Sequence, residues 1–424
     1  MKLIKREDVL WLRHLREVDM PVPPGRAALF RLNACEILFE PMRPGRGGWP
    51  TPGLRVAEAN REVWSRIPKG MEIDLKLIRV HDDGPAPSVD LVANPHGSFR
   101  DSGAERQTNS DRTNGLLDAV ELPPSRITTF DAYLMVDWSA ASKRRTGKDS
   151  VWWCVCTWRR GRLAIEANKN PPTRQACFDA VRQQLRELVA SGSRVLVAFD
   201  FPYGYPFGFA RMLGLGGTAW RAIWKELSSR VVDEVDNTNN RFRVANDLNA
   251  MSGASEGPFW GHPPGQMYLR LHATEPTYPV RGLTRLRETE RHARGAQPIW
   301  KLWGNGSVGG QALLGLPFLA RLRDDKELRE SSRVWPFETG CTLPLRDHSA
   351  RIVFAEIYPS LVRLAGDFGG RVIDAKQVEA TARYLARHDA EGTLGNLFTA
   401  PARLETTTRH RVEVEEGWIL GVVP

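Results

Sequence analysis

The chain has 424 residues, of which 42% are hydrophobic and 26% are charged, as in ordinary globular proteins. No apolar run approaches the roughly 20 residues that cross a bilayer, and the N-terminus lacks the apolar segment of a secretory signal, so we expect a cytoplasmic protein with no membrane partner. The five cysteines include no CxxC pair, which argues against a zinc site or a disulfide framework.

The net charge of +9 is unevenly distributed along the chain. Residues 1–130 contribute +1 and the rest contributes +8. This basic excess permits a polyanionic partner, either a nucleic acid or a phosphorylated small molecule. It is also common in proteins that bind no nucleic acid, so the partner stays open. The sequence predicts no particular oligomeric state.

The first 125 residues are predicted to form an accessory or partly disordered N-terminal region without a catalytic motif. Residues 41–53 and 93–115 are rich in Pro, Gly, Ser, Asn and charge, a composition that buries little apolar surface. Three elements are expected in the region: an amphipathic helix at 6–18, a helix near 54–67 and a strand near 71–80. A reading frame extended upstream of the natural start is the alternative interpretation.

Residues 126–424 have the alternating pattern of an α/β domain. The expected elements are strands over 130–137, 150–158 and 163–167, a helix over 173–190, a strand over 194–200, a strand over 351–359 and a helix from 374. In the first helix, Cys177, Val181, Leu185 and Leu188 repeat at helical spacing and predict one buried stripe. Between the last two strands lies an insertion at about 215–345, which is long for a simple loop.

Acidic residues end or interrupt three of these strands. Asp137 and Asp200 each follow an apolar run, and Glu356 lies inside the strand over 351–359. Ligands of open α/β sheets bind beyond the carboxyl ends of the strands, and burying a carboxylate without a partner is costly. Asp374 begins the next helix, where capping that helix is the alternative role.

Four segments together resemble a bacterial family of uncharacterised ribonuclease H-like proteins. They are "VDWSAAS…TGKDSVW", "VAFDFPYGYP", "WKLWGNGSVGGQALLGLP" and "AEIYPSL…DAKQV". The resemblance covers about residues 129–424. It implies an RNase H-like mixed sheet flanked by helices, with carboxylates clustered at one edge, and it implies no established reaction.

In nucleases of this superfold, three or four carboxylates hold two divalent ions that stabilise the attacking and leaving oxygens of a phosphodiester. By that resemblance, Asp137, Asp200, Glu356 and Asp374 are expected to be both the catalytic residues and the ligands of Mg²⁺ or Mn²⁺, which favour carboxylate oxygens. Asp389 lies on the same predicted helix as Asp374 and is its substitute. The expected function is a divalent-metal-dependent phosphodiesterase or nuclease.

Candidate substrate contacts lie in polar segments around these acids. The segment GNGSVGGQ, residues 304–311, has glycines that allow close approach of a ligand and an anion-binding nest, although a flexible turn is the alternative. The insertion is rich in aromatic and basic residues that are suited to stacking a base or a ring. The candidates are Lys148, Arg243, Asn246, Trp260, Lys301, Ser307 and Gln311.

Two other classes of function remain open. Sugar-kinase and actin-type ATPases share this core, so a nucleotide-binding phosphotransferase is one alternative. The first predicted hairpin, however, lacks the short turn rich in Gly, Ser and Thr that is typical of those ATPases. A non-catalytic binding module that retained the fold is the other alternative.

Overall fold

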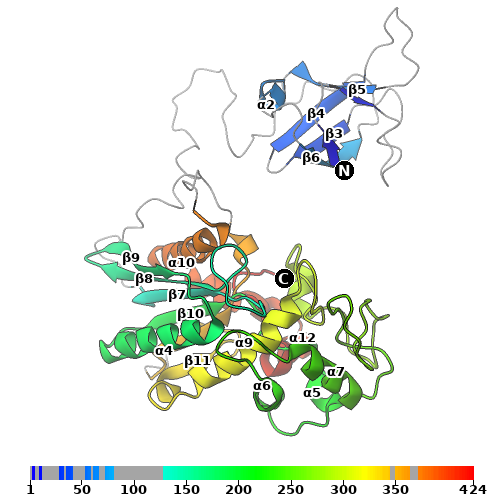
Figure 1. Ribbon diagram of the computed structural model, residues 1–424. Coiled ribbons are helices and arrows are strands. Elements are labelled where there is room, and N and C mark those ends of the chain that lie inside the picture. Colours follow the sequence, from blue (N-terminus) through cyan, green and yellow to red (C-terminus); the bar gives the residue numbers. More distant parts are fainter. Residues whose placement is uncertain are drawn as a thin grey trace, which may run out of the picture. The chain divides into compact units, whose positions relative to one another are not determined.

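The computed structural model divides the chain into two compact units, Met1–Asn114 and Gly115–Pro424 (Figure 1). Each unit is described by itself. The structure describes residues 2–4, 9–11, 28–32, 35–41, 53–58, 61–65, 72–80, 128–343, 349–362 and 371–424.

The N-terminal unit contains a six-stranded sheet with the order β1-β6-β3-β4-β5-β2. Its elements are β1 (Lys2–Ile4), β2 (Val9–Trp11), β3 (Ala28–Leu32), β4 (Cys35–Pro41), β5 (Gly53–Val56), α2 (Arg61–Ser65) and β6 (Glu72–Val80). All the strand pairs are antiparallel. Phe39 packs edge-on against both Phe30 and Trp64, and all three side chains are buried. This unit therefore has an apolar core of its own.

The predictions for the N-terminal region were partly wrong. The strand near 71–80 is confirmed as β6. The helix at 6–18 is wrong where the chain is described, because β2 pairs with β5 there. The helix near 54–67 is replaced by β5 followed by the short α2. Strand pairing between distant segments overrides local helical periodicity here. Residues 93–115 and most of 41–53 lie outside the described residues.

The second unit is built on a six-stranded mixed sheet with the order β11-β12-β10-β7-β8-β9. The strands are β7 (Ala132–Asp137), β8 (Trp152–Arg159), β9 (Arg162–Lys169), β10 (Val195–Phe199), β11 (Ser332–Val334) and β12 (Ile352–Glu356). Strands β7, β10, β12 and β11 run parallel, while β8 and β9 continue from β7 as antiparallel hairpins. The expectation of a mixed α/β sheet flanked by helices is confirmed.

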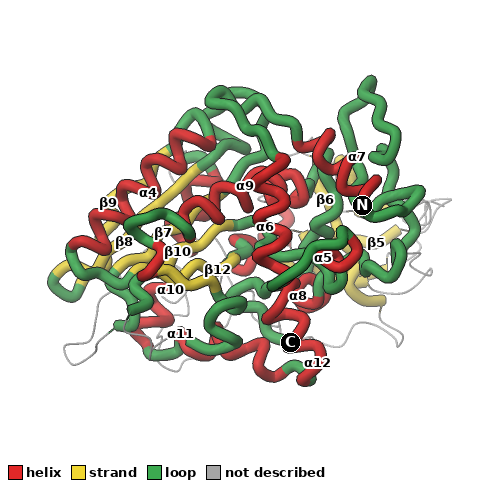
Figure 2. The backbone as a smooth tube through the Cα atoms, turned by 90° about the horizontal axis from the view of Figure 1, so that it is seen from below, coloured by secondary structure: helices red, strands yellow, loops and turns green. Residues whose placement is uncertain are grey.

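Helices cover both faces of this sheet (Figures 1 and 2). They are α4 (Arg174–Ala190), α5 (Phe209–Met212), α6 (Ala219–Arg230), α7 (Arg241–Met251), α8 (Glu288–His292), α9 (Val308–Arg323), α10 (Ile373–Glu391), α11 (Leu394–Thr399) and α12 (Thr406–Arg411). The apolar cluster on one face joins α4, α6 and α9, and α10 packs on β7, β8 and β9 from the other. The predicted stripe of α4 is buried as expected. No described helix is long and apolar enough to cross a membrane.

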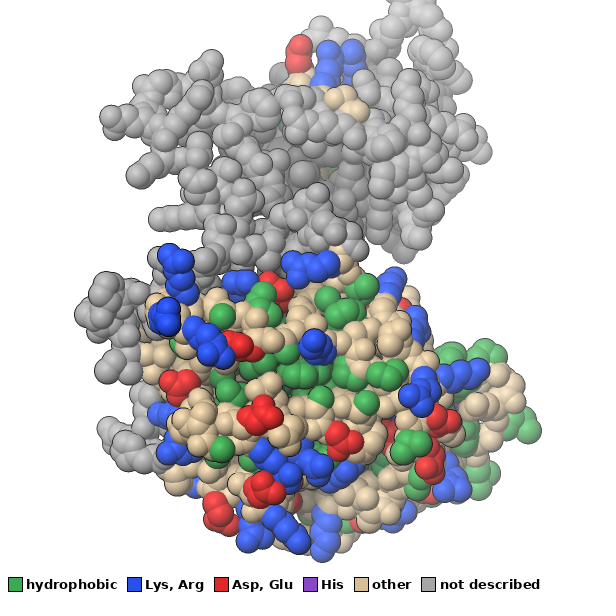
Figure 3. All heavy atoms as spheres, turned by 60° about the vertical axis from the view of Figure 1, so that its left-hand side comes forward, with side chains coloured by type: hydrophobic (Ala, Val, Ile, Leu, Met, Phe, Trp, Pro, Cys, Tyr) green, Lys and Arg blue, Asp and Glu red, His purple; other side chains and the backbone are tan. Residues whose placement is uncertain are grey.

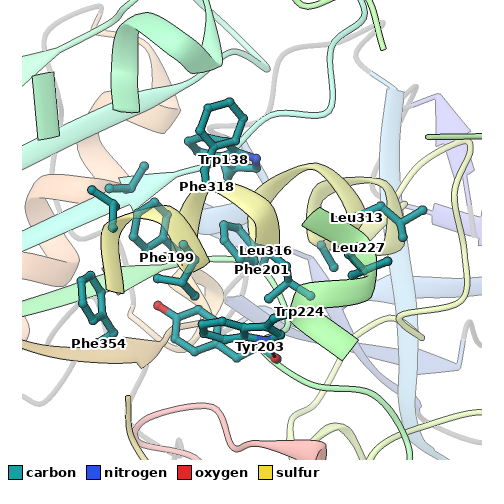
Figure 4. Packing of buried hydrophobic residues seen from close by; sticks show 14 of the residues in the cluster. Trp138, Phe199, Phe201, Tyr203, Trp224, Leu227, Leu313, Leu316, Phe318 and Phe354 are labelled. Atoms are coloured by element: carbon teal, nitrogen blue, oxygen red, sulfur yellow. Dashed lines mark hydrogen bonds between the residues drawn. The ribbon is translucent and has the colours of Figure 1, made fainter. Parts of the chain in front are cut away.

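Side chains alternate between the two faces along each strand. Val136, Phe199 and Phe354 belong to the cluster with α4 and α9 (Figure 4). Their neighbours toward the N-terminus of each strand, such as Met135 and Ala198, belong to the cluster with α10. This alternation decides which acidic residues at the strand ends can meet.

Part of the predicted insertion belongs to the core of this unit. Helix α9 packs against the sheet, where Phe318 contacts Trp138 with ring centroids 5.2 Å apart. Gly315 of α9 makes this packing possible, because a Cβ there would lie 2.4 Å from the ring of Phe201. Strand β11 extends the sheet beyond β12. The segment at 215–345 therefore contributes a core helix, α9, and an edge strand, β11, to the second unit and is not only a lid.

Candidate functional site

Asp137 and Asp200 lie side by side at the carboxyl ends of adjacent parallel strands. Val136 is paired with Phe199 in the register of β7 and β10, so the next residue of each strand is an aspartate. Each carboxyl group shifts the pKa of the other. The backbone N–H of Trp138 donates to Asp200 Oδ1 at 2.7 Å. The predicted meeting of these two acids at the sheet edge is thus present in the structure.

Asp374 joins this pair from the first turn of α10. Its charge raises the pKa values of both Asp137 and Asp200, so the three carboxyl groups interact. Asp374 does not cap the helix, because the capping position is Val372 and has no side-chain cap. Its Oδ2 instead accepts the backbone N–H of Asp149 at 2.7 Å. This bond ties α10 to the loop between β7 and β8.

The protonation of the three acids follows from their burial and mutual repulsion. Burial, then the charges of Asp200 and Asp374, raise the pKa of Asp137 well above its ordinary value. Burial also raises the pKa of Asp200 to about 7, against the lowering effect of the bonds from Trp138 and Asp137. Burial raises the pKa of Asp374. Like charges this close resist ionisation, so the charged forms of these acids are disfavoured in the folded protein.

Asp149 is a further acid near the cluster, and the sequence analysis missed it. Its charge raises the pKa values of Asp137 and Asp374. The side chain is exposed and pairs with Arg145 at 3.3 Å. The signal in the sequence was its place directly before β8, the antiparallel partner of β7, which returns the chain to the end of β7.

Glu356 is not brought to the three aspartates, which corrects its predicted place in the cluster. In the register of β10 and β12, Glu356 is paired with Phe199 rather than with Asp200. It therefore faces the side of the sheet opposite to Asp200. There it forms a buried ion pair with Arg287, with Nη2 to Oε1 at 2.6 Å and Nη1 to Oε2 at 2.8 Å. Its partner is thus a cationic side chain.

Asp389, the predicted substitute for Asp374, lies at the other end of α10. Its carboxylate accepts the backbone N–H groups of Thr129 and Phe130 at 2.9 Å each. It also accepts the hydroxyl of Tyr133 at 2.6 Å. Asp389 therefore anchors the chain that leads into β7, and Asp374 is the helical acid near Asp137 and Asp200.

The loop after Asp137 is held in place by one buried and one half-buried side chain. Arg174, fully buried, donates from Nη1 to the carbonyls of Ser139 at 2.9 Å and Ala141 at 2.7 Å. Its charge is balanced by Asp233 at 2.6 Å. Gln311, predicted as a substrate contact, donates to the carbonyl of Trp138. These bonds hold the loop that begins at Trp138, the residue whose N–H donates to Asp200.

The glycine-rich segment 304–311 has a structural reason for its composition. The N–H groups of Val308, Gly309 and Gly310 donate to the carbonyls of Gly306, Lys301 and Ser307, so these three do not form an open anion nest. A Cβ at Gly309 would lie 2.0 Å from the carbonyl oxygen of Ile299. Ser307 precedes α9 without a side-chain cap bond.

The remaining candidates lie on and around α7 and the loop after β7. Lys148 and Arg243 are exposed. Asn246 Oδ1 accepts the backbone N–H of Arg270 at 2.8 Å, which is a structural role. Lys301 Nζ lies 5.6 Å from the ring centroid of Trp260, and the two residues also form a parallel β-bridge.

The three aspartates have the donor chemistry that Mg²⁺ and Mn²⁺ prefer. Among the described residues, no group of three or more His, Cys, Asp or Glu side chains is arranged to hold a metal ion. The residue types of the three aspartates fit a divalent ion.

No family model, curated protein or solved structure matches the chain.

Proposed function

We propose that the protein is a hydrolase of phosphodiester bonds that depends on a divalent cation. Asp137, Asp200 and Asp374 would hold the ion, and the ion would supply charge neutralisation and an activated water when bound. The single observation that carries the proposal is the convergence of these three carboxyl groups at the carboxyl edge of a parallel pair of strands.

The electrostatics of the site favour a cation as the partner. Burial and the charge of Asp374 raise the pKa values of Asp137 and Asp200, so their charged forms are disfavoured. A bound divalent cation would offset the repulsion among the three carboxylates, since opposite charge lowers the pKa values of carboxyl groups. Perturbed acids of this kind are concentrated at functional sites.

The order of the strands supports the same proposal. Five strands of the sheet lie in the spatial order β9-β8-β7-β10-β12, and only β8 is antiparallel to its neighbours. Asp137 and Asp200 follow the two central strands, β7 and β10. The resemblance to ribonuclease H-like proteins implies a mixed sheet with carboxylates clustered at one edge. The corresponding phosphotransferase alternative has less support, because three N–H groups at the start of α9 are already bonded to the chain.

A hydrolysis assay tests the proposal. The full chain is incubated with bis(p-nitrophenyl) phosphate and Mn²⁺, and release of p-nitrophenolate is followed. We expect activity that is abolished by chelation and reduced at least about a hundredfold by Asp137→Asn or Asp374→Asn, as for loss of a group that stabilises a transition state. Asp389→Asn, on the same helix but away from the site, is the matched control. Activity that persists in both site variants would overturn the proposal.

A further inference from the structure

The region between α7 and the start of α9 carries half-exposed rings close together. The ring of Phe242 lies 6.3 Å from that of Trp303 and 6.3 Å from that of Tyr268, and Tyr268 lies 5.6 Å from His262. Phe242 is buried, Tyr268 and His262 are half-buried, and Trp303 is 44% exposed. We call these four residues the aromatic surface. A buried Phe thus supports rings that offer their faces or edges to solvent.

Apolar side chains project beside these rings. Met267 is 94% exposed and Leu269 is 82% exposed, in the same loop as Tyr268. Met267 and Leu269 stand on either side of Tyr268 in the chain. Two long apolar side chains exposed this far and this close together indicate an interaction site.

A basic loop leads from the aromatic surface to the aspartates. Arg241, next to Phe242, donates from Nη1 to Ser142 Oγ at 2.9 Å. Residues 142–149 then run to Asp149, whose N–H bonds Asp374. The exposed side chains of this loop include Lys143 and Lys148. The loop therefore connects the two regions through contacts at both of its ends.

Several cations along this route have no acidic partner within the described part of the chain. Lys143, Lys148, Arg243 and Arg270 form no ion pair with a described residue. On the face shown in Figure 3, basic and acidic side chains are interspersed. Free cations beside stacked rings are the pattern that binds single-stranded nucleic acid, because the cations neutralise phosphates and the rings stack on bases.

We propose that the aromatic surface and the basic loop bind a single-stranded nucleic acid and direct it to the aspartates. The bases stack on Trp303 and Tyr268, and the phosphates follow Arg243, Lys143 and Lys148 toward Asp137. A duplex does not fit this mode, because its bases are stacked on one another and do not reach the rings. The inference names the substrate class of the proposed hydrolase and rests on that function for the chemistry, whereas binding itself is independent of it.

Binding is measured by fluorescence anisotropy with a labelled 15-nucleotide single strand, DNA and RNA in parallel, in the presence of a chelator so that no cleavage occurs. We expect saturable binding of the single strand and at least tenfold weaker binding of the same sequence as a duplex. Trp303→Ala and Tyr268→Ala should each weaken binding about five- to a hundredfold, as for loss of one stacked base. Because Trp303 and Tyr268 are partly exposed, their replacement is compatible with folding, and thermal melting verifies it.

Two controls keep the result specific. Arg329→Ala removes an exposed arginine that pairs with Glu330 in a short 3-10 turn, Arg329–Ser331, after the end of α9, and should leave binding within twofold. Increasing the salt concentration should weaken binding by the wild type, and Lys143→Ala with Lys148→Ala together should reduce that salt dependence.

Three outcomes would overturn the inference: equal binding of duplex and single strand, unchanged binding in both ring variants, or capture by vesicles containing phosphatidylserine without binding of either oligonucleotide. The last outcome would assign the exposed Met267 and Leu269 to a lipid surface. The hydrolysis assay separates the two proposals. If the protein hydrolyses the small phosphodiester but binds no oligonucleotide, the proposed function is supported and this inference is wrong. If it binds the single strand but does not hydrolyse the phosphodiester, the proposed function is wrong and this inference is supported.

Discussion

Asp137 and Asp200 lie side by side at the carboxyl ends of two adjacent parallel strands, and each shifts the pKa of the other. This arrangement is a direct consequence of register, because the residues before them, Val136 and Phe199, are paired across β7 and β10. It brings together two acids whose charged forms are disfavoured unless a proton or a cation compensates them.

Replacing Asp200 should change how stability depends on pH. The pKa of this group is raised from its ordinary value of 3.8 to about 7, so the folded state binds more protons than the unfolded state between these pH values. Stability from this group therefore falls as the pH rises through that window. Without divalent ions, Asp200→Asn should be more stable than the wild type at pH 8 by more than about 1 kcal/mol, and the difference should vanish near pH 4. Denaturant unfolding at both pH values measures it.

The variant retains an oxygen that can accept the N–H of Trp138, so the loop is expected to keep its place. If Asp200→Asn were less stable than the wild type at pH 8, the buried charge of Asp200 would not be destabilising as described.

Removing Arg287 should destabilise the protein strongly. Its guanidinium is fully buried and bonds Glu356, Glu290 and the carbonyl of Glu416. Breaking a buried pair leaves an uncompensated charge, which costs about 3–5 kcal/mol. Arg287→Met should therefore lower the free energy of unfolding by about that amount, as determined by denaturant titration.

An exposed pair two residues away provides the comparison. Arg285 and Glu275 form an ion pair with side chains 46% and 31% exposed, and Arg285→Met should cost less than about 1 kcal/mol. Similar losses in both variants would show that Glu356 is not held as described.

The glycines of segment 304–311 should differ in their tolerance of a side chain. At Gly309 an added Cβ would meet the carbonyl oxygen of Ile299, whereas at Gly304 it would meet open space. Gly309→Ala should cost more than about 2 kcal/mol or alter the start of α9. Gly304→Ala should cost only about 1–2 kcal/mol for its positive φ of 86°. Thermal unfolding of the two variants compares them directly, and equal effects would contradict the packing account of this segment.

Asp389→Asn should weaken the attachment of the chain before β7 without affecting the aspartate cluster. The carboxylate accepts three hydrogen bonds, from Thr129, Phe130 and Tyr133, and hydrogen bonds to a charged group contribute about 1.5–3 kcal/mol each. A loss of about 1–3 kcal/mol in the free energy of unfolding is expected. Hydrogen exchange of the amides at the start of β7 should increase as well, and unchanged protection there would contradict the anchoring role.

Local sequence patterns predicted the strands β7, β8, β9, β10 and β12 and the helices α4 and α10, because each of these elements carries its own periodicity. The apolar run before Asp137 and the stripe of α4 are examples. The same patterns predicted that Asp137 and Asp200 each end a strand, whereas their clustering was implied by the resemblance.

The error at Glu356 arose from register, which the sequence does not show. A shift of one residue moves a side chain to the other face of a sheet, and Glu356 is one position earlier than Asp200 in the paired strands. The choice between Asp374 and Asp389 also required the direction in which α10 crosses the sheet. In the N-terminal unit only β6 was predicted, and the expected helix at 6–18 was wrong because β2 pairs with β5, which is distant in sequence.

The central claim is tested most directly by calorimetric titration of the full chain with Mn²⁺ at pH 8, where the pKa of about 7 leaves Asp200 largely ionised. The wild type and Asp389→Asn are predicted to bind, and Asp137→Asn and Asp374→Asn are predicted to bind at least tenfold more weakly. Absence of binding by the wild type, also in the presence of a single-stranded oligonucleotide, would contradict the account, as would unchanged binding in both site variants.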